Sequence, residues 1–209
     1  AIKETEKLLI NERESYDLNN LYGVLNQALN KCDLAIKSYR KAINIRPDIA
    51  ETHNNLGIAL RQVGKVQQAI ASYEQAIFLN PNYAEAYNNL GVALKANKQI
   101  QKALKHYQIA IKLRPEYAEA YKNIGNLFQE IGEIDKALES YKSAINIKPD
   151  YLEVIHMVSA LENKTTSTAP RAYVENLFDN YAENFENSLE NQLAYKAPED
   201  FSKLLYKEI

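Results

Sequence analysis

The sequence predicts an all-α fold, a right-handed superhelix of paired helices that is followed by a helical C-terminal extension. The first observation is a period of 34 residues, at which five columns keep one residue type through four copies. The second is that apolar residues recur at helical spacing within a copy, as Tyr87, Leu90 and Leu94 do. Such a period is typical of a solenoid. The columns are Pro47, Pro81, Pro115 and Pro149; Gly23, Gly57, Gly91 and Gly125; Ala35, Ala69, Ala103 and Ala137; Tyr39, Tyr73, Tyr107 and Tyr141; and Ala42, Ala76, Ala110 and Ala144.

One copy predicts two helices and a turn. The first helix covers residues 84–97, and the turn falls near Lys98, where two other copies hold Gly64 and Gly132, residues suited to a left-handed helix end. The second helix covers residues 99–113 and cannot continue through Pro115. Gly91 and Ala103 are small, and so we expect the two helices to cross closely there.

This unit resembles the tetratricopeptide repeat. The residues that carry the resemblance in one copy are Tyr87, Leu90, Gly91, Leu94, Ala103, Tyr107, Ala110 and Pro115. It covers four units, 16–49, 50–83, 84–117 and 118–151, of which the first is less regular, with Asn19 and Asn26 in place of Tyr87 and Leu94. Residues 1–15 are expected to be the second helix of a truncated repeat, because 1–13 align with 35–47. Residues 152–164 are expected to form a capping helix.

Asparagines next to the core positions predict a binding groove. Leu56, Gly57 and Leu60 mark the packed side of one first helix, so Asn54, Asn55 and Ile58 lie on the other side, which stacking turns into a concave surface. Asn55, Asn89 and Asn123 then form a ladder of amides that can pair with an extended peptide backbone. The ladder is similar to that of the O-GlcNAc transferase superhelix, where asparagines hold peptide main chain. The predicted groove residues are Asn54, Asn55, Ile58, Asn88, Asn89, Val92, Lys122, Asn123 and Asn126.

The alternative is that these amides only bond to a neighbouring helix, and the sequence does not decide between the two roles. Three hydrogen bonds contribute roughly 2–4 kcal/mol, short of the ~8 kcal/mol of a micromolar complex, so a ligand also needs apolar or charged contacts. If the amides bind a ligand, replacing Asn55 and Asn89 by alanine should weaken its capture and leave thermal stability nearly unchanged.

Residues 165–209 break the period and are expected to form a linker and helices that lead to a further domain. Residues 152–205 resemble the junction in bacterial proteins that join tetratricopeptide repeats to an S-adenosylmethionine-dependent methyltransferase. The residues that carry the resemblance include Ala169-Pro170, Leu177-Phe178-Asp179, Tyr181-Ala182 and Ala197-Pro198. The resemblance implies S-adenosylmethionine in the full-length protein, with Tyr181 and Phe185 as weak candidate cofactor neighbours, although packing is the commoner role of such aromatic stripes. Apolar residues in 171–209 could also mediate self-association.

Composition excludes several classes of function. The net charge of −2, from 25 basic and 27 acidic residues, shows no basic block of the kind that duplex nucleic-acid binding needs. No apolar run is long enough to predict a membrane span, and a single cysteine, Cys32, makes a cytoplasmic setting the expectation. No catalytic cluster and no metal-ligand spacing appears around the three histidines, so no catalytic residue, metal or cofactor is assigned to these 209 residues.

The sequence therefore predicts a scaffold that binds an extended peptide or partner protein, as the N-terminal part of a methyltransferase. The alternatives are the substrate-recruiting arm of a glycosyltransferase similar to O-GlcNAc transferase, a stand-alone adaptor, and an enzyme complete in itself, which the absence of a cofactor loop opposes.

Overall fold

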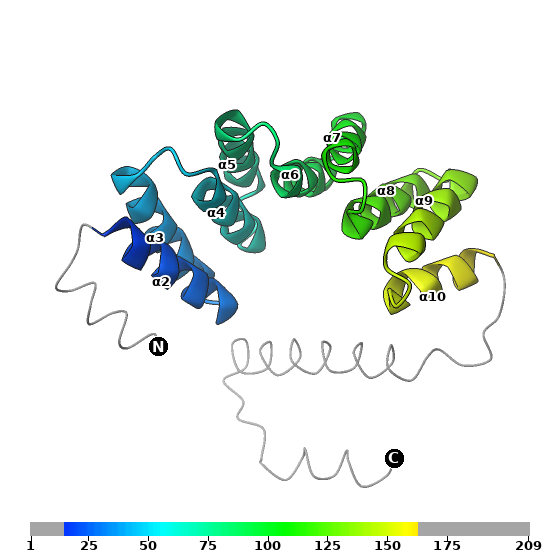
Figure 1. Cartoon of the computed structure of the whole chain (residues 1–209), viewed down its shortest axis with the longest axis horizontal. Helices are drawn as coiled ribbons and strands as arrows, with labels where there is room; N and C mark the ends of the chain where they lie inside the picture. Colours follow the sequence, from blue (N-terminus) through cyan, green and yellow to red (C-terminus); the bar gives the residue numbers. More distant parts are fainter. Residues whose placement is uncertain (1–14, 163–209) are drawn as a thin grey trace, which may run out of the picture. The chain divides into compact units, whose positions relative to one another are not determined.

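The computed structural model describes residues 15–162, and every element in this part of the chain is an α-helix. Eight of the helices form four pairs that follow one another in chain order (Figure 1). Repeat 1 consists of α2 (Tyr16–Ala28) and α3 (Cys32–Ile45), repeat 2 of α4 (Ala50–Gln62) and α5 (Val66–Leu79), repeat 3 of α6 (Ala84–Ala96) and α7 (Ile100–Leu113), and repeat 4 of α8 (Ala118–Glu130) and α9 (Ile134–Ile147). The helix α10 (Leu152–Leu161) follows. The all-α solenoid that the sequence predicts is confirmed.

Each pair turns through a residue in the left-handed conformation. The four residues with positive φ are Asn30 at 57°, Gly64 at 75°, Lys98 at 59° and Gly132 at 81°. They occur once per repeat, two residues before the second helix begins. Glycine adopts this conformation without strain, whereas lysine has a Cβ atom that disfavours it. The predicted turn position is therefore confirmed. Of the four residues at this position, Lys98 is the one for which the left-handed conformation is least favourable.

A glycine–tyrosine contact fixes how closely the two helices of a repeat approach. In repeat 3, a Cβ atom added to Gly91 would lie 2.5 Å from Cε1 of Tyr107, and the other three repeats show the same relationship. Tyr107 is buried, with 1% of its surface exposed. The sequence analysis paired Gly91 with Ala103 as small residues at a close crossing. The structure shows that the tyrosine ring occupies the space that a Cβ atom on the glycine would take, and that Ala103 is fully buried in the core.

The core is continuous from repeat to repeat. One cluster of buried side chains extends from Ala35 on α3 to Leu127 on α8. The second helix of each repeat packs against the first helix of the next, as α3 does against α4, and first helices also contact one another, as α4 does α6. Because first helices are neighbours, side chains one period apart on these helices lie next to each other in space.

The chain divides into two compact units, Ala1–Val154 and Ile155–Ile209. The predicted capping segment 152–164 contains α10, which ends at Leu161 and crosses the boundary between the two units. The predicted truncated repeat lies outside the described residues except for Ser15, as does the whole of the predicted extension 165–209 with Tyr181 and Phe185. Within the described helices, none is both long and apolar enough to cross a membrane.

Candidate functional site

The candidate site is a surface of the first helices, which we call the first-helix face. It consists of two residues per repeat at 34-residue spacing: Leu21 and Val24, Asn55 and Ile58, Asn89 and Val92, and Asn123 and Asn126. All eight side chains are at least partly exposed. Seven of the nine predicted groove residues are partly exposed; the other two, Asn54 and Asn88, are buried, with 4% and 2% of their surface exposed.

The two buried asparagines form hydrogen bonds between repeats. Nδ2 of Asn89 donates to Oδ1 of Asn54 over 2.9 Å, and Nδ2 of Asn123 donates to Oδ1 of Asn88 over 2.9 Å. The exposed asparagine of one repeat thus bonds to the buried asparagine of the repeat before it. Asn54 and Asn88 therefore hold neighbouring first helices together, as the helix-bonding alternative predicts for them, and they are too buried to meet a ligand.

The exposed asparagines keep most of their hydrogen-bonding capacity. A primary amide has two N–H donors and one carbonyl acceptor, and the bond to Asn54 uses one donor of Asn89. The second N–H and the carbonyl of Asn89 form no hydrogen bond with the residues that the structure describes. Asn123 likewise uses one N–H in its bond to Asn88, and its second N–H and its carbonyl form no hydrogen bond with the described residues. A buried amide thus orients an exposed amide that still has a free donor and a free acceptor.

Tyrosines extend this network toward the N-terminal end of each following first helix. The pKa of Tyr83 is raised, mainly by burial and also by Glu51 and Glu85, while a hydrogen bond from Asn54 lowers it. Burial likewise raises the pKa of Tyr117 to about 12, against a hydrogen bond from Asn88. Each buried asparagine thus interacts with an asparagine of the next repeat and with the tyrosine that directly precedes the next first helix.

Lys122 occupies the position of the buried asparagine in repeat 4. Its Nζ lies 3.3 Å from Oε2 of Glu153 and 5.4 Å from the centre of the Tyr151 ring. Burial opposes its charge, but hydrogen bonds to Tyr151 and Glu153 outweigh burial, so the pKa of Lys122 is raised. Lys122 is therefore paired within the fold, and it replaces the asparagine bond with an ionic one.

Three further residues of the face also form contacts within the protein, namely Asn126, Ile58 and Val92. The Tyr141 hydroxyl lies 2.7 Å from Oδ1 of Asn126 and 2.8 Å from Oε1 of Gln129, so these oxygens share its proton. Ile58 and Val92 pack with part of their surface against the core. They offer a ligand only their remaining exposed surface.

Leu21 and Val24 are members of the face that the sequence analysis missed. They are 47% and 43% exposed, which is high for apolar side chains on a helix. The irregularity of repeat 1 hid them, although subtracting 34 from Asn55 and Ile58 leads directly to both positions. Next to them the amide pattern is interrupted, because Oδ1 of Asn20 has no hydrogen-bond partner and Asn55 forms no side-chain hydrogen bond with the described residues.

Acidic residues begin every first helix, and two of them are paired. Asp17, Glu51, Glu85, Glu119 and Glu153 lie in the first turns of α2, α4, α6, α8 and α10, where a negative charge suits the helix dipole. Glu85 bonds to Arg114, which raises the pKa of the arginine, and the guanidinium lies 5.0 Å from the centre of the Tyr117 ring. Glu153 is the partner of Lys122.

The described residues hold no cluster of three side chains that could ligate a metal. Cys32 is buried at the start of α3, near the amide oxygens of Asn30 and Gln62, and Nε2 of His53 lies 2.9 Å from the Pro47 carbonyl oxygen. The partners that the structure shows for these two side chains are amide and backbone carbonyl oxygens, which are neither bases nor nucleophiles.

Comparisons with known proteins agree with this geometry. A family model described as "TPR repeat" matches residues 27–64 and 57–98, and one described as "Tetratricopeptide repeat" matches residues 82–150. No curated protein matches the sequence. A crystal structure of MamA is 26% identical with a TM-score of 0.66, over 73% of this chain and 89% of that one. A second MamA crystal structure is 27% identical with a TM-score of 0.62, over 93% of this chain and 96% of that one. MamA from Desulfovibrio magneticus RS-1, residues 41 to the end, is 19% identical with a TM-score of 0.66, over 72% of this chain and 85% of that one.

Proposed function

Because the chain belongs to the tetratricopeptide repeat proteins, we propose that its repeats are a binding scaffold whose first-helix face holds an extended peptide or a segment of a partner protein. The observation that carries the proposal is the paired amide arrangement. Asn54 and Asn88 each accept one hydrogen bond from Asn89 and Asn123, whose remaining donor and acceptor form no hydrogen bond within the described residues. An extended backbone presents N–H and C=O groups at regular intervals, and such amides can bond to it whatever its side chains are.

The apolar part of the binding energy comes from the repeat 1 end of the face. Amide hydrogen bonds alone supply about 0.5–1.5 kcal/mol each. Full burial of an aliphatic side chain adds about 1.5–3 kcal/mol, and Leu21 and Val24 still expose nearly half of their surface. An apolar ligand side chain next to these two residues would therefore supply much of the affinity, and the amides would fix the direction of the backbone.

A selection from a random peptide library identifies a probe for this proposal. Enriched peptides are then measured by fluorescence polarisation against the wild-type protein, Asn55→Ala, and the double variant Leu21→Ser/Val24→Ser. Gln75→Ala on α5, an exposed residue outside the face, is the matched control. We expect roughly tenfold weaker binding for each face variant and no change for the control, in line with the loss of about 1.4 kcal/mol.

A second measurement tests whether the backbone is read. N-methylation of single peptide bonds removes one donor and leaves the side chains intact, so it should weaken binding at the positions next to the asparagines. If N-methylated peptides bind as well as the parent, or if the Gln75 variant loses affinity and the face variants do not, the first-helix face is not the binding surface.

We further propose, from the resemblance of residues 152–205, that the repeats belong to a longer S-adenosylmethionine-dependent methyltransferase and deliver its substrate in the cytoplasm. A substrate-recruiting arm of a glycosyltransferase and a stand-alone adaptor are the competing contexts. The continuation of the gene beyond Ile209 tests all three: a strand followed by a glycine-rich loop supports the methyltransferase, and a stop codon or a glycosyltransferase domain contradicts it.

A further inference from the structure

His106 on α7 breaks the pattern of its column in the repeats. The corresponding residues are serines, and their hydroxyls donate to the carbonyl four residues earlier over 2.8–2.9 Å in Ser38, Ser72 and Ser140. The His106 ring instead stacks with Tyr87, with ring centres 5.9 Å apart. Its Nδ1 atom is buried and has no hydrogen-bond partner within the described residues. Buried polar atoms normally form hydrogen bonds, so Nδ1 of His106 lacks a bond that its burial would usually require.

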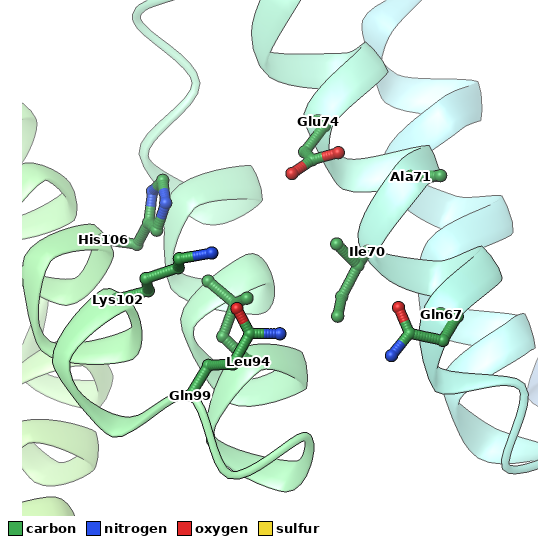
Figure 2. A pocket seen from close by; sticks show the side chains of 8 residues that line it. All are labelled: Gln67, Ile70, Ala71, Glu74, Leu94, Gln99, Lys102 and His106. Carbon is green, nitrogen blue, oxygen red and sulfur yellow. The ribbon is translucent and has the colours of Figure 1, made fainter.

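A cavity of about 360 Å³ lies beside His106, between α5 and α7. Figure 2 shows Ile70 and Gln67 extending toward it from α5 and Lys102 from the opposite side, and Leu94 of α6 also lines it. This volume is at the lower end of the range for small-molecule sites. None of the residues that line the cavity belongs to the first-helix face, so an inference from the cavity does not depend on the function proposed above.

The two walls of the cavity carry opposite charges that do not meet. Glu74 lies on α5 and Lys102 on α7, and no ion pair joins them in the part of the chain that the structure describes. One repeat earlier the corresponding residues are joined, since Nη2 of Arg40 donates to Oε1 of Gln68 over 3.0 Å. The groove between α5 and α7 therefore keeps both charges available.

These charges select the class of ligand. Glu74 would repel an anion, and Lys102 would repel a cation, so a ligand with a single charge meets an unfavourable wall. A ligand that carries an ammonium group at one side and a carboxylate at the other complements both walls. Ile70 and Leu94 give the cavity an apolar part that suits an aliphatic side chain.

We propose that this cavity binds the zwitterion of a small apolar α-amino acid. The ammonium group lies against Glu74, the carboxylate lies against Lys102 and His106, and the side chain covers Ile70 and Leu94. The carboxylate lies beside the partly exposed His106 ring, where its negative charge favours the protonated imidazole.

The electrostatics of His106 provide a direct signal of binding. Burial lowers the pKa of His106, and the positive charges of Lys105 and Lys102 lower it further. A carboxylate beside the ring favours its protonated form, so a bound amino acid raises the pKa. The titratable side chains around the ring are Glu74, Lys102, Lys105 and Tyr87.

The test is a titration with L-leucine, followed by NMR of the backbone amides and of the histidine rings. Isocaproate, which lacks the ammonium group, and isoamylamine, which lacks the carboxylate, are the comparison ligands. We expect saturable shifts at α5 and α7 with L-leucine, binding at least about tenfold weaker for both analogues, and a rise in the pKa of His106. The chain has three histidines, and the signal that disappears in His106→Ser identifies the ring.

Variants at the exposed residues test the charges without disturbing the core. Glu74→Gln and Lys102→Gln should each weaken L-leucine binding about tenfold, whereas Arg40→Gln, the matched change in the preceding groove, should leave it unchanged. The proposal is overturned if L-leucine causes no saturable shift at α5 and α7, if isocaproate binds as well as L-leucine, or if Arg40→Gln weakens binding as much as Glu74→Gln.

Discussion

Asn89 of repeat 3 donates a hydrogen bond of 2.9 Å to the buried carbonyl of Asn54 in repeat 2. The same bond joins Asn123 to Asn88 one repeat later. Adjacent asparagines on one helix thus have different tasks: the buried amide joins two repeats, and the exposed amide faces outward. This division gives the first prediction.

Replacing Asn88 by alanine should destabilise the protein by about 1–3 kcal/mol. The change removes the acceptor of the Asn123 bond and the partner of Tyr117, and it leaves both groups partly buried. Urea unfolding followed by circular dichroism measures the effect. Asn55→Ala is the control, because Asn55 forms no side-chain hydrogen bond with the described residues, and it should stay within about 0.5 kcal/mol of the wild type.

The same reasoning revises the expectation for Asn89→Ala. The sequence analysis expected nearly unchanged stability when Asn55 and Asn89 are both replaced, but loss of the Asn89 amide deprives the buried Asn54 carbonyl of its donor. The double variant should therefore be less stable than Asn55→Ala alone. Equal stability of the two would show that the bond between Asn89 and Asn54 contributes nothing.

Gly91→Ala should destabilise repeat 3 by roughly 1–3 kcal/mol, although alanine is the better helix former. The added methyl group would lie 2.5 Å from the Tyr107 ring, which is packed on all sides and cannot move freely. A double-mutant cycle with Tyr107→Leu checks the cause. The two changes should cost less together than the sum of the single costs, and strict additivity would rule out the contact as the source.

Lys98→Gly should stabilise the protein by about 0.5–1 kcal/mol. Lys98 has a φ of 59°, and the left-handed conformation costs a residue with a Cβ atom about 1–2 kcal/mol, from which the greater chain entropy of glycine in the unfolded state is subtracted. Thermal unfolding measures the gain. Lys98→Ala removes the same charged side chain but keeps the Cβ atom, so a comparable gain in that variant would contradict the backbone explanation.

Stability should fall as the pH rises from about 10 to about 12. Burial raises the pKa of Tyr39, Tyr117 and Tyr141 to about 12, while an unfolded tyrosine titrates near 10. The folded state therefore keeps protons that the unfolded state loses, so this contribution is complete below about pH 10 and disappears as the pH approaches 12. Urea unfolding at a series of pH values measures it, with tyrosinate absorbance as the second probe.

Tyr39→Phe is the matching variant for the pH dependence. It removes one of the buried phenols, so its stability should decline less steeply over the same pH interval. It also loses the 2.8 Å bond from the hydroxyl to Gln27, which lowers stability at every pH and does not change the slope. An equal slope in the two proteins would mean that Tyr39 does not keep its proton in the folded state.

The sequence by itself determined the repeats. Helix starts at Tyr16, Ala50, Ala84 and Ala118, turns at Gly64 and Gly132, and buried tyrosines such as Tyr107 all follow from local periodicity, because residue spacing fixes what lies on one side of a helix. The same spacing selected Asn55, Asn89 and Asn123 as partly exposed amides. Applied one period earlier, it also leads to Leu21.

Only the tertiary structure decided what each side chain meets. Asn54 and Asn55 differ by one helical step and both lie near the border of the packed side, so the position of the next repeat decides which is buried. The same holds for Glu74 and Lys102, whose spacing equals that of the bonded pair Arg40 and Gln68 although no ion pair joins them. A period in the sequence specifies positions along a helix, whereas contacts between repeats depend on how one helix pair is rotated and displaced against the next.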